Sequence, residues 1–335
     1  MKVWMWPKEN STNKYNELLS TSLEEEGIDV KEFNKSKAFK MKKNDIFHFH
    51  WIYPLYQANN RLIFIMKSIA LVIYLYINKV RGVKLVWTLH NLYPHKYKFI
   101  KLEKLVRKII LLIVDEIFVA STSIKDKVIK EFSLNANKVS VVKHGHYLDA
   151  YPTNELKRDK YNISKEDYVF LFLGAIQEYK GTLKLLEEYV KTNIYSNSKL
   201  LIVGKPDQIM KEKLKKFQND KNIILDLRFV PEEEINGIIG ISNIVVLPYK
   251  QITTSGSAIL ALSNKKPFIA PKNAFFEEYF NDRTCILYSN DDLKEALEAA
   301  FKKEFYADDF DDVLETLNWD KIAKFIIKRY KKIIR

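Results

Sequence analysis

The segment Phe170-Leu-Phe-Leu-Gly-Ala-Ile-Gln-Glu-Tyr-Lys180-Gly181 joins an apolar run to a glycine, a lysine and a second glycine. The apolar run predicts a buried strand that ends at Gly174, and the residues after Lys180 have the period of a helix. Glycine allows close backbone approach at the strand tip, and the N-terminus of a helix offers free amide donors. The segment therefore predicts a strand, a loop able to bind an anion, and a helix.

A second segment repeats this order seventy-five residues later. It reads Val245-Val-Leu-Pro248-Tyr249-Lys250-Gln-Ile-Thr253-Thr254-Ser255-Gly256-Ser257-Ala258. Its hydroxyl groups and Gly256 precede a predicted helix, and this arrangement suits a phosphate group. The alternative is an ordinary helix cap made by a serine or threonine. Two such strand tips in one region indicate a nucleoside diphosphate more strongly than either does alone.

Short apolar runs alternate with stretches of helical period on both sides of these segments. The first half predicts strands at Val3–Trp6, Asp45–Phe49, Val83–Leu89, Glu116–Ala120 and Val139–Lys143, with helices near 12–27, 59–80, 99–114 and 122–132. The second half predicts strands at Tyr168–Leu173, Lys199–Val203, Ile223–Leu227, Ile244–Leu247, Pro267–Ala270 and Cys285–Tyr288, with helices near 181–195, 207–218, 232–240, 256–264 and 291–303. Such alternation predicts parallel sheets covered by helices on both faces.

Residues 148–166 interrupt this alternation with a polar stretch, which we interpret as a linker. The chain therefore predicts an α/β fold of two doubly wound domains, at 1–150 and 151–317. Ligands of such sheets bind beyond the carboxyl ends of the strands, so we expect a cleft between two facing domains.

Composition narrows the classes of function. The chain has 335 residues, 47% of them apolar or aromatic, a formal net charge of +13, and a single cysteine, Cys285. One cysteine excludes an intramolecular disulfide and a metal site built from cysteines, and it fits a reducing cytoplasm. The N-terminal stretch is too short for a signal peptide and predicts a first buried strand. No signature of a nucleic-acid-binding fold is present, so we expect no nucleic-acid partner.

The positive charge instead suggests an anionic membrane surface. Lysines crowd residues 31–43, and further lysines with Arg107 crowd residues 96–108. Between them lies the apolar stretch Leu62–Ile77, which contains Lys67 and is short for a membrane span. It predicts a buried crossover helix, or one lying partly in a membrane interface. The alternative for the basic residues is that they are solvated faces of helices.

The two phosphate-competent segments resemble the donor site of GT-B glycosyltransferases close to family 4. The matching residues are Gly174 with Lys180-Gly181, Pro248-Tyr249, Thr254-Ser255-Gly256-Ser257 and Lys266-Pro-Phe-Ile-Ala-Pro271. The resemblance implies two Rossmann-like domains facing a central cleft, with the helix at 318–335 crossing back onto the N-terminal domain. It implies donor binding by Gly174, Lys180, Gly181, Tyr249, Thr254, Ser255, Gly256 and Ser257, to which we add Glu278.

Two departures from the family pattern bear on mechanism. Many family 4 members have an arginine just after the donor-loop glycine, where this chain has Ala175. Many retaining members carry two glutamates eight positions apart, where this chain has Ile252 and Leu260. The donor diphosphate must therefore depend more on Lys180 and on helix N-termini, and a retaining outcome does not follow from the resemblance.

The six histidines stand in three pairs at predicted strand ends of the first half: His48 and His50, His90 and His95, and His144 and His146. Histidine suits proton transfer near neutral pH. Segment 87–95 and segment 143–147 resemble bacterial polysaccharide-assembly enzymes, in which a histidine matching His90 contacts the donor sugar. We predict His95 and His90 as catalytic residues, and His50, His144 and His146 as acceptor or cleft residues. No carboxylate lies between the pairs at ligand spacing, so no metal is expected.

The resemblance implies transfer of a hexose from GDP-mannose or a UDP-sugar to a lipid-linked saccharide, in exopolysaccharide or cell-surface glycan synthesis. The expected enzyme needs no cofactor and lies at the cytoplasmic face of the cell membrane. Two alternatives stay open: a non-catalytic nucleotide- or lipid-binding protein of the same fold, and a sugar-nucleotide epimerase of similar shape.

Overall fold

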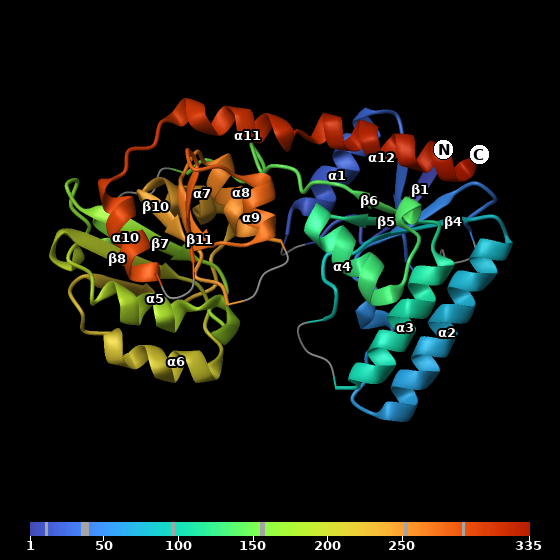
Figure 1. The fold of residues 1–335 in the computed structure, drawn as a ribbon, viewed down its shortest axis with the longest axis horizontal. Helices are drawn as coiled ribbons and strands as arrows, with labels where there is room; N and C mark the ends of the chain where they lie inside the picture. The colour runs from blue at the N-terminus through green and yellow to red at the C-terminus, as the bar shows by residue number, and fades with distance from the viewer. Residues whose placement is uncertain (11–12, 35–39, 95–97, 155–157, 251–253, 290–291) are drawn as a thin grey trace. The chain divides into compact units, whose positions relative to one another are not determined.

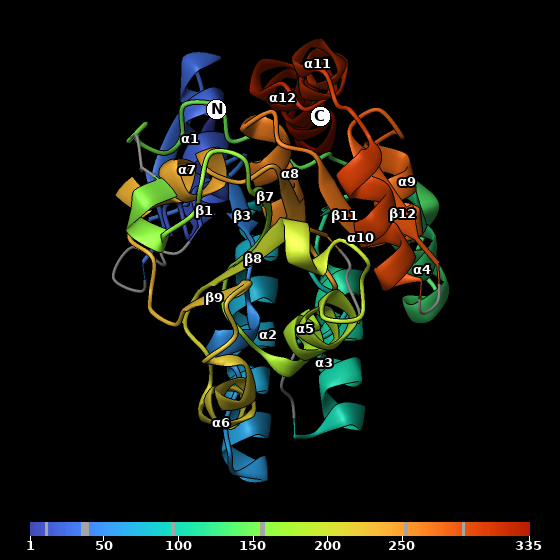
Figure 2. The same ribbon diagram turned by 90° about the vertical axis from the view of Figure 1, so that its left-hand side faces the viewer.

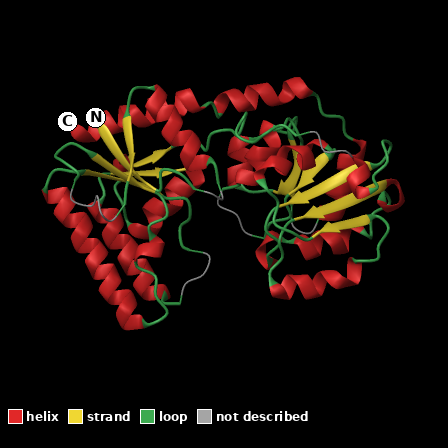
Figure 3. Ribbon diagram, turned by 180° about the vertical axis from the view of Figure 1, so that it is seen from behind, coloured by secondary structure: helices red, strands yellow, loops and turns green. Residues whose placement is uncertain are grey.

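The structure, a computed structural model, describes residues 1–10, 13–34, 40–94, 98–154, 158–250, 254–289 and 292–335. The chain divides into two compact units, of which unit 1 comprises Met1–Gly145 with Leu317–Arg335 and unit 2 comprises His146–Thr316. In each unit a sheet of parallel strands is covered by helices (Figure 3). The predicted α/β fold with two doubly wound sheets is confirmed.

The sheet of unit 1 has the strand order β2-β1-β3-β4-β5-β6, and every pairing is parallel. Its strands are β1 (Lys2–Trp6), β2 (Asp29–Glu32), β3 (Ile46–Phe49), β4 (Lys84–Thr88), β5 (Glu116–Val119) and β6 (Val139–Val141). Its helices are α1 (Tyr15–Glu25), α2 (Arg61–Val80), α3 (Ile100–Ile113), α4 (Thr122–Phe132) and α12 (Trp319–Ile334). The edge strand β2 was not predicted, because its sequence is mostly charged and three of its four residues are exposed.

A separate apolar core lies on each face of this sheet. On one face, Leu71 and Leu75 of α2, Ile110 of α3 and Val128 of α4 pack with side chains of the strands. On the other face, α1 and α12 pack together, with Leu19 and residues of α12 in a second cluster. The helix that follows unit 2 in the chain therefore belongs to unit 1 (Figure 1).

Helix α2 touches the sheet along a narrow stripe only. Its buried residues are Phe64, Ser68, Leu71, Leu75 and Asn78. Large apolar side chains on the rest of the helix are exposed. The prediction of a buried crossover helix is therefore wrong for most of its surface. Within the described residues, α2 is the one helix long and apolar enough to cross a membrane by length and composition.

The sheet of unit 2 has the order β12-β11-β10-β7-β8-β9, again with parallel pairings (Figure 2). Its strands are β7 (Tyr168–Leu173), β8 (Ser198–Val203), β9 (Ile223–Asp226), β10 (Ile244–Val246), β11 (Phe268–Pro271) and β12 (Cys285–Tyr288). Its helices are α5 (Thr182–Tyr189), α6 (Gln208–Leu214), α7 (Glu232–Gly240), α8 (Gly256–Ser263), α9 (Ala274–Tyr279), α10 (Leu293–Lys302) and α11 (Asp311–Thr316). The six-residue helix α9 was not predicted.

Candidate functional site

The two phosphate-competent segments meet at the centre of the sheet of unit 2. Strand β7 is the first strand of this sheet in chain order and lies in its interior. The next two strands, β8 and β9, are added on one side of β7, and β10 then pairs with its other side. The boundary between β7 and β10 is therefore the point where the strand order reverses, and ligands of open α/β sheets bind there. Gly174 follows β7, and Pro248 lies two residues after β10.

Glycines let the backbone of these loops pack closely. Gly181 has φ of +73°, and a Cβ atom there would lie 1.8 Å from the carbonyl oxygen of Pro248. Gly204, after β8, has φ of +150°, and its Cβ would lie 1.8 Å from the carbonyl oxygen of Gly174. A side chain at either position would displace a neighbouring loop. Gly174 itself has φ of +140°, and no described atom lies within 4 Å of its Cβ position. The space next to Gly174 is therefore open.

Lys180 ends a short 3-10 turn, Glu178–Lys180, just before α5. Its Nζ lies 4.1 Å from the ring centroid of Tyr249 and 5.6 Å from that of Tyr179. The loops are also joined by a hydrogen bond from the Lys250 amide to the Tyr179 carbonyl, at 3.0 Å. Among the described residues Lys180 has no carboxylate partner, so its charge is held over aromatic rings rather than neutralised.

The second phosphate-competent segment leads into α8. Ser255 is buried and caps α8, because its hydroxyl accepts a hydrogen bond from the Ala258 amide at 3.1 Å. The cap alternative therefore holds for Ser255. Thr254, Gly256 and Ser257 are half-buried beside it, while residues 251–253, including Ile252, lie outside the described residues. Glu278 lies half-buried on α9.

Thr182 was missed by the sequence reasoning. It is the first residue of α5, directly after Gly181, and it is completely buried. Its hydroxyl has no hydrogen-bond partner within the part of the chain that the structure describes. A hydroxyl residue just after Lys-Gly at a helix start was the available signal.

Four histidines of unit 1 come together at the carboxyl edge of its sheet. His48 lies inside β3, and its Nδ1 and Nε2 are 2.6 Å from the Tyr330 hydroxyl and 2.7 Å from the Thr88 hydroxyl. His144 contacts Tyr15, with ring centroids 4.5 Å apart. His48 is therefore a satisfied core histidine that ties β3 to β4 and α12.

His50, which is buried, and His90, which is half-buried, form the side of this cluster that lines a cavity. Their Nδ1 and Nε2 atoms are 3.1 Å apart, and the Trp51 ring stacks on His90 with centroids 4.3 Å apart. The Nε2 atom of His50 is buried and has no hydrogen-bond partner among the described residues. His95 lies outside the described residues, and His146 belongs to unit 2.

Burial controls the charge of these rings. It lowers the pKa of His48 and of His90 to about 3 and that of His144 to about 4. The pKa of His50 is also far below its ordinary value, through burial and then through the neighbouring His48 and His90. All four imidazoles are therefore neutral at physiological pH. A ring with so low a pKa is a weak general base but a good hydrogen-bonding group.

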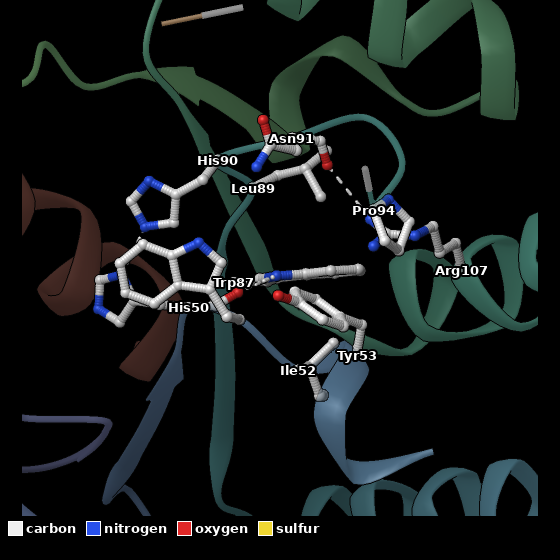
Figure 4. Close-up of a pocket in the computed structure, with 10 residues that line it drawn as sticks. His50, Ile52, Tyr53, Trp87, Leu89, His90, Asn91, Pro94 and Arg107 are labelled. Carbon is white, nitrogen blue, oxygen red and sulfur yellow. Dashed lines mark hydrogen bonds between the residues drawn. The ribbon is translucent and has the colours of Figure 1, made fainter. Parts of the chain in front are cut away.

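A cavity of about 200 Å³ opens beside His50 and His90. Figure 4 shows these two histidines at one end and Arg107 at the other, with Tyr53 and Trp87 between them. Trp51 and Asn91 also line it. Three aromatic rings with a few polar groups are typical of a site for a ring-shaped polar ligand.

Arg107 is buried at the far end of this cavity, with 3% of its surface exposed. Its Nε donates to Glu103 at 2.7 Å, its Nη1 donates to the Asn91 carbonyl at 3.2 Å, and the Tyr56 hydroxyl donates to the same carboxylate at 2.6 Å. The expectation that Arg107 belongs to a basic surface segment is therefore wrong. Because Glu103 neutralises it, the cavity suits a neutral ligand better than an anion.

Residues 153–312 match a protein family described as Glycosyl transferases group 1. The chain is 28% identical over 257 residues to the GDP-mannose:glycolipid 4-beta-D-mannosyltransferase of Xanthomonas campestris pv. campestris, a match covering 75% of this chain and 69% of that protein. A second protein of that name matches over 69% of this chain and 62% of its own length. An uncharacterized glycosyltransferase of Methanocaldococcus jannaschii is 31% identical over 113 residues, or 32% of this chain and 27% of that protein.

Solved structures share the fold of the whole chain. The Anabaena protein HepE in complex with UDP has a TM-score of 0.69 at 12% identity, with 99% of each chain covered. Sucrose-phosphate synthase of Thermosynechococcus elongatus has a TM-score of 0.68 at 14% identity, covering 97% of this chain and 80% of that one. The lipopolysaccharide outer core galactosyltransferase WaaB has 0.66 at 14%, covering 97% and 99%. All three support the two-sheet architecture described above.

Proposed function

We propose that this chain, which is a glycosyltransferase of the GT-B fold, transfers a hexose from a nucleoside-diphosphate sugar to a lipid-linked saccharide in exopolysaccharide or cell-surface glycan synthesis. The observation that carries the proposal is the pair of glycine loops at the boundary of β7 and β10, where Gly181 packs on Pro248 and Lys180 has no carboxylate partner among the described residues.

The chemistry of these loops fits a departing diphosphate. Negative charge grows on the leaving group as the bond to the sugar breaks, and a positive charge held in place stabilises it. Lys180 supplies that charge, and the N-termini of α5 and α8 supply oriented amides. Gly174, Gly256 and Ser257 would border the diphosphate, with Tyr249 holding Lys180 in position. These groups would stabilise the departing diphosphate without a metal ion, so we propose a metal-independent reaction.

The donor proposal follows the relatives. Two curated relatives are named as users of GDP-mannose, and a structural neighbour was solved with UDP. We therefore propose GDP-mannose as the first donor to test and UDP-sugars as the next.

The acceptor proposal rests on the cavity of unit 1. A pyranose ring fits among Trp51, Tyr53 and Trp87, with its hydroxyls within reach of the neutral histidines at one end and of the ion-paired Arg107 at the other. Since burial makes His90 a weak base, we assign it a hydrogen-bonding role and retain His95 as the proposed proton acceptor. His50 would orient His90 through their ring nitrogens, and His144 would do so through Tyr15, which contacts both rings.

The lipid-linked acceptor places the reaction at a membrane, and we propose the cytoplasmic face of the cell membrane. Lys40, Lys42 and Lys43 are exposed in one basic segment, and Lys98 and Lys101 are exposed in the other. Basic residues near an anionic leaflet contribute about 1 kcal/mol each to binding. Anionic lipid is therefore the proposed surface partner.

Product analysis tests the proposal directly. The full chain would be incubated with radiolabelled GDP-mannose or UDP-sugars and with lipid-linked saccharides extracted from membranes, with and without EDTA. We expect label in the lipid fraction with at least one donor, and no loss in EDTA. Nucleotide binding without transfer to any acceptor would favour the non-catalytic alternative, and rescue of EDTA-inhibited transfer by Mg²⁺ or Mn²⁺ would contradict metal independence.

A further inference from the structure

The outer surface of α2 is apolar from end to end. The side chains of Leu62, Met66 and Val80 are each about 70% exposed, and Ile69, Ile73 and Tyr76 between them are more than half exposed. A 20-residue helix is about 30 Å long, so these residues form a continuous apolar strip of that length. A strip of this size is unusual on a protein surface that faces water.

Two small uncharged polar residues of α2 point the other way. Ser68 and Asn78 are buried against unit 1, and each donates a hydrogen bond to the backbone of its own helix, to Phe64 at 2.7 Å and to Tyr74 at 2.9 Å. Water would favour the opposite arrangement. A helix that hides its small polar side chains and exposes its leucines and isoleucines is suited to an apolar medium.

Helix α3 packs against α2 (Figures 1 and 2) and also carries exposed apolar side chains. Its Leu105 and Leu112 are more than half exposed. Its exposed Lys101 and Lys108 lie on the same side of the helix, next to these leucines. The apolar surface therefore has a basic border.

The charges distinguish a lipid bilayer from a protein partner. Helix α2 contains no acidic residue, and the one acid of α3, Glu103, is buried against Arg107. Every charged side chain exposed on the two helices is thus positive. A large apolar surface with a border of one positive sign matches acyl chains beneath anionic headgroups.

We propose that the α2–α3 pair inserts into one leaflet of a lipid bilayer, and that apolar contact rather than charge supplies most of the attachment. Phe64, Leu71 and Leu75 hold α2 on the core of unit 1, so the helix lies in the interface instead of crossing it. The inference rests on the proposed function for its acceptor, a lipid-linked saccharide, but vesicle binding is measured without donor or acceptor.

Flotation of the full chain with vesicles tests this inference. Wild type and the double variant Ile69→Glu/Ile73→Glu would be floated with pure phosphatidylcholine vesicles and with vesicles that also contain phosphatidylglycerol, at 0.1 and 1 M NaCl. The matched control is Ile209→Glu on α6 of unit 2, since Ile209 is 66% exposed. Circular dichroism would verify that each variant folds.

We expect wild type and Ile209→Glu to float with neutral vesicles at both salt concentrations, with added binding to anionic vesicles at low salt only. The double variant should partition roughly tenfold or more weakly, because two charges are placed in the apolar strip. Absence of wild-type binding to neutral vesicles, or unchanged binding of the double variant, overturns the proposal. So does a stable wild-type dimer in buffer that the double variant converts to monomer without vesicle binding. A wild-type protein that floats with vesicles but transfers no sugar would count against the proposed function instead.

Discussion

The two units use the same architecture to build opposite environments at the carboxyl edges of their sheets. In unit 2 the edge consists of glycine loops, an open position at Gly174 and a lysine held over the ring of Tyr249. In unit 1 the edge is filled by stacked aromatic rings and by four histidines that burial keeps neutral. Small residues and unpaired charge suit an anion, whereas neutral rings suit a polar ligand without charge.

The difference matches the two roles that we propose for the units in a glycosyl transfer. The donor brings a diphosphate, whose charge must be matched, and the acceptor brings a sugar, whose hydroxyls and ring faces must be matched. Glu103 neutralises Arg107, so even the one buried cation among the described residues that line the unit 1 cavity adds little net charge. Fold alone does not produce this division, because both sheets are parallel and doubly wound.

The largest expected difference between the units is their response to acid. In unit 1 burial lowers the pKa values of His48, His50, His90 and His144, whereas the sequence of unit 2 contains a single histidine, His146, which is half-buried. Unfolding lets a histidine take up a proton at about pH 6.5, while the folded pKa lies near 3 or 4 for three of these residues. The stabilising effect is therefore complete above pH 6.5 and is lost as the pH falls toward the folded values.

Each such histidine lowers the free energy of unfolding by at most about 1.4 kcal/mol per pH unit in this window. Hydrogen exchange at pH 7.5, 6 and 5 should show unit 1 opening first. The variant His144→Gln should make the free energy of unfolding less dependent on pH, because about one proton fewer is taken up on unfolding. Equal loss of protection in both units would mean that the histidine cluster does not control acid stability.

The next largest effect should come from Gly181→Ala. The new Cβ would meet the Pro248 carbonyl, and φ of +73° disfavours any side chain, so the two donor loops must separate. We expect donor kcat/KM to fall by roughly 100-fold or more, since strain of this kind costs about 1–3 kcal/mol and the loops also lose their alignment. Gly27→Ala is the matched control, because Gly27 has φ of +81° with no described atom near its Cβ position. Similar losses of activity in both variants would show that the Gly181 contact has no specific role in donor binding.

Lys180→Ala should have a smaller effect at the same loops. Removing one charge-assisted contact should cost about 1.5–3 kcal/mol of diphosphate interaction, or roughly 10- to 100-fold in activity at limiting donor. Lys211→Ala, at an exposed position on α6, serves as the control. Steady-state kinetics over donor concentration provide the measurement. Near-wild-type kinetics for Lys180→Ala would show that the diphosphate binds elsewhere.

The smallest predicted change concerns the acceptor cavity. Trp51→Ala removes the ring that stacks on His90 and lines the cavity. An aromatic contact of this kind contributes about 0.5–1.5 kcal/mol, so the acceptor KM should rise up to about tenfold while nucleotide binding stays unchanged. Tyr306→Ala, an exposed aromatic of unit 2, is the comparison variant. A rise in the donor KM instead would show that Trp51 contacts the donor and not the acceptor.

The strand, loop and helix order of the two phosphate-competent segments was predictable because its signals are local. The glycine, the lysine and the helix start of the first segment lie within twelve residues, and the cap at Ser255 follows from its position before α8. Apolar runs likewise placed eleven of the strands near their observed positions. The strand β2 and helix α9 escaped, since a short charged edge strand and a six-residue helix carry little periodicity.

The environment of unit 1 depends on contacts between distant residues, which the sequence does not reveal. His48 meets Tyr330 across 282 positions, and the cavity joins the ends of β3 and β4 to α3. Arg107 resembles its exposed basic neighbours in sequence, yet it lies on the side of α3 that faces the core. Composition also could not tell which side of α2 faces outward, because both sides are rich in apolar residues.

We propose that the donor diphosphate binds to unit 2, at the boundary of β7 and β10, and not to the histidine cluster of unit 1. Hydrogen exchange of the full chain with and without GDP or UDP tests it most directly. We expect ligand-dependent protection at residues 174–182 and 248–257, with unchanged exchange at residues 48–53 and 87–91. Protection confined to those two segments of unit 1 would contradict it.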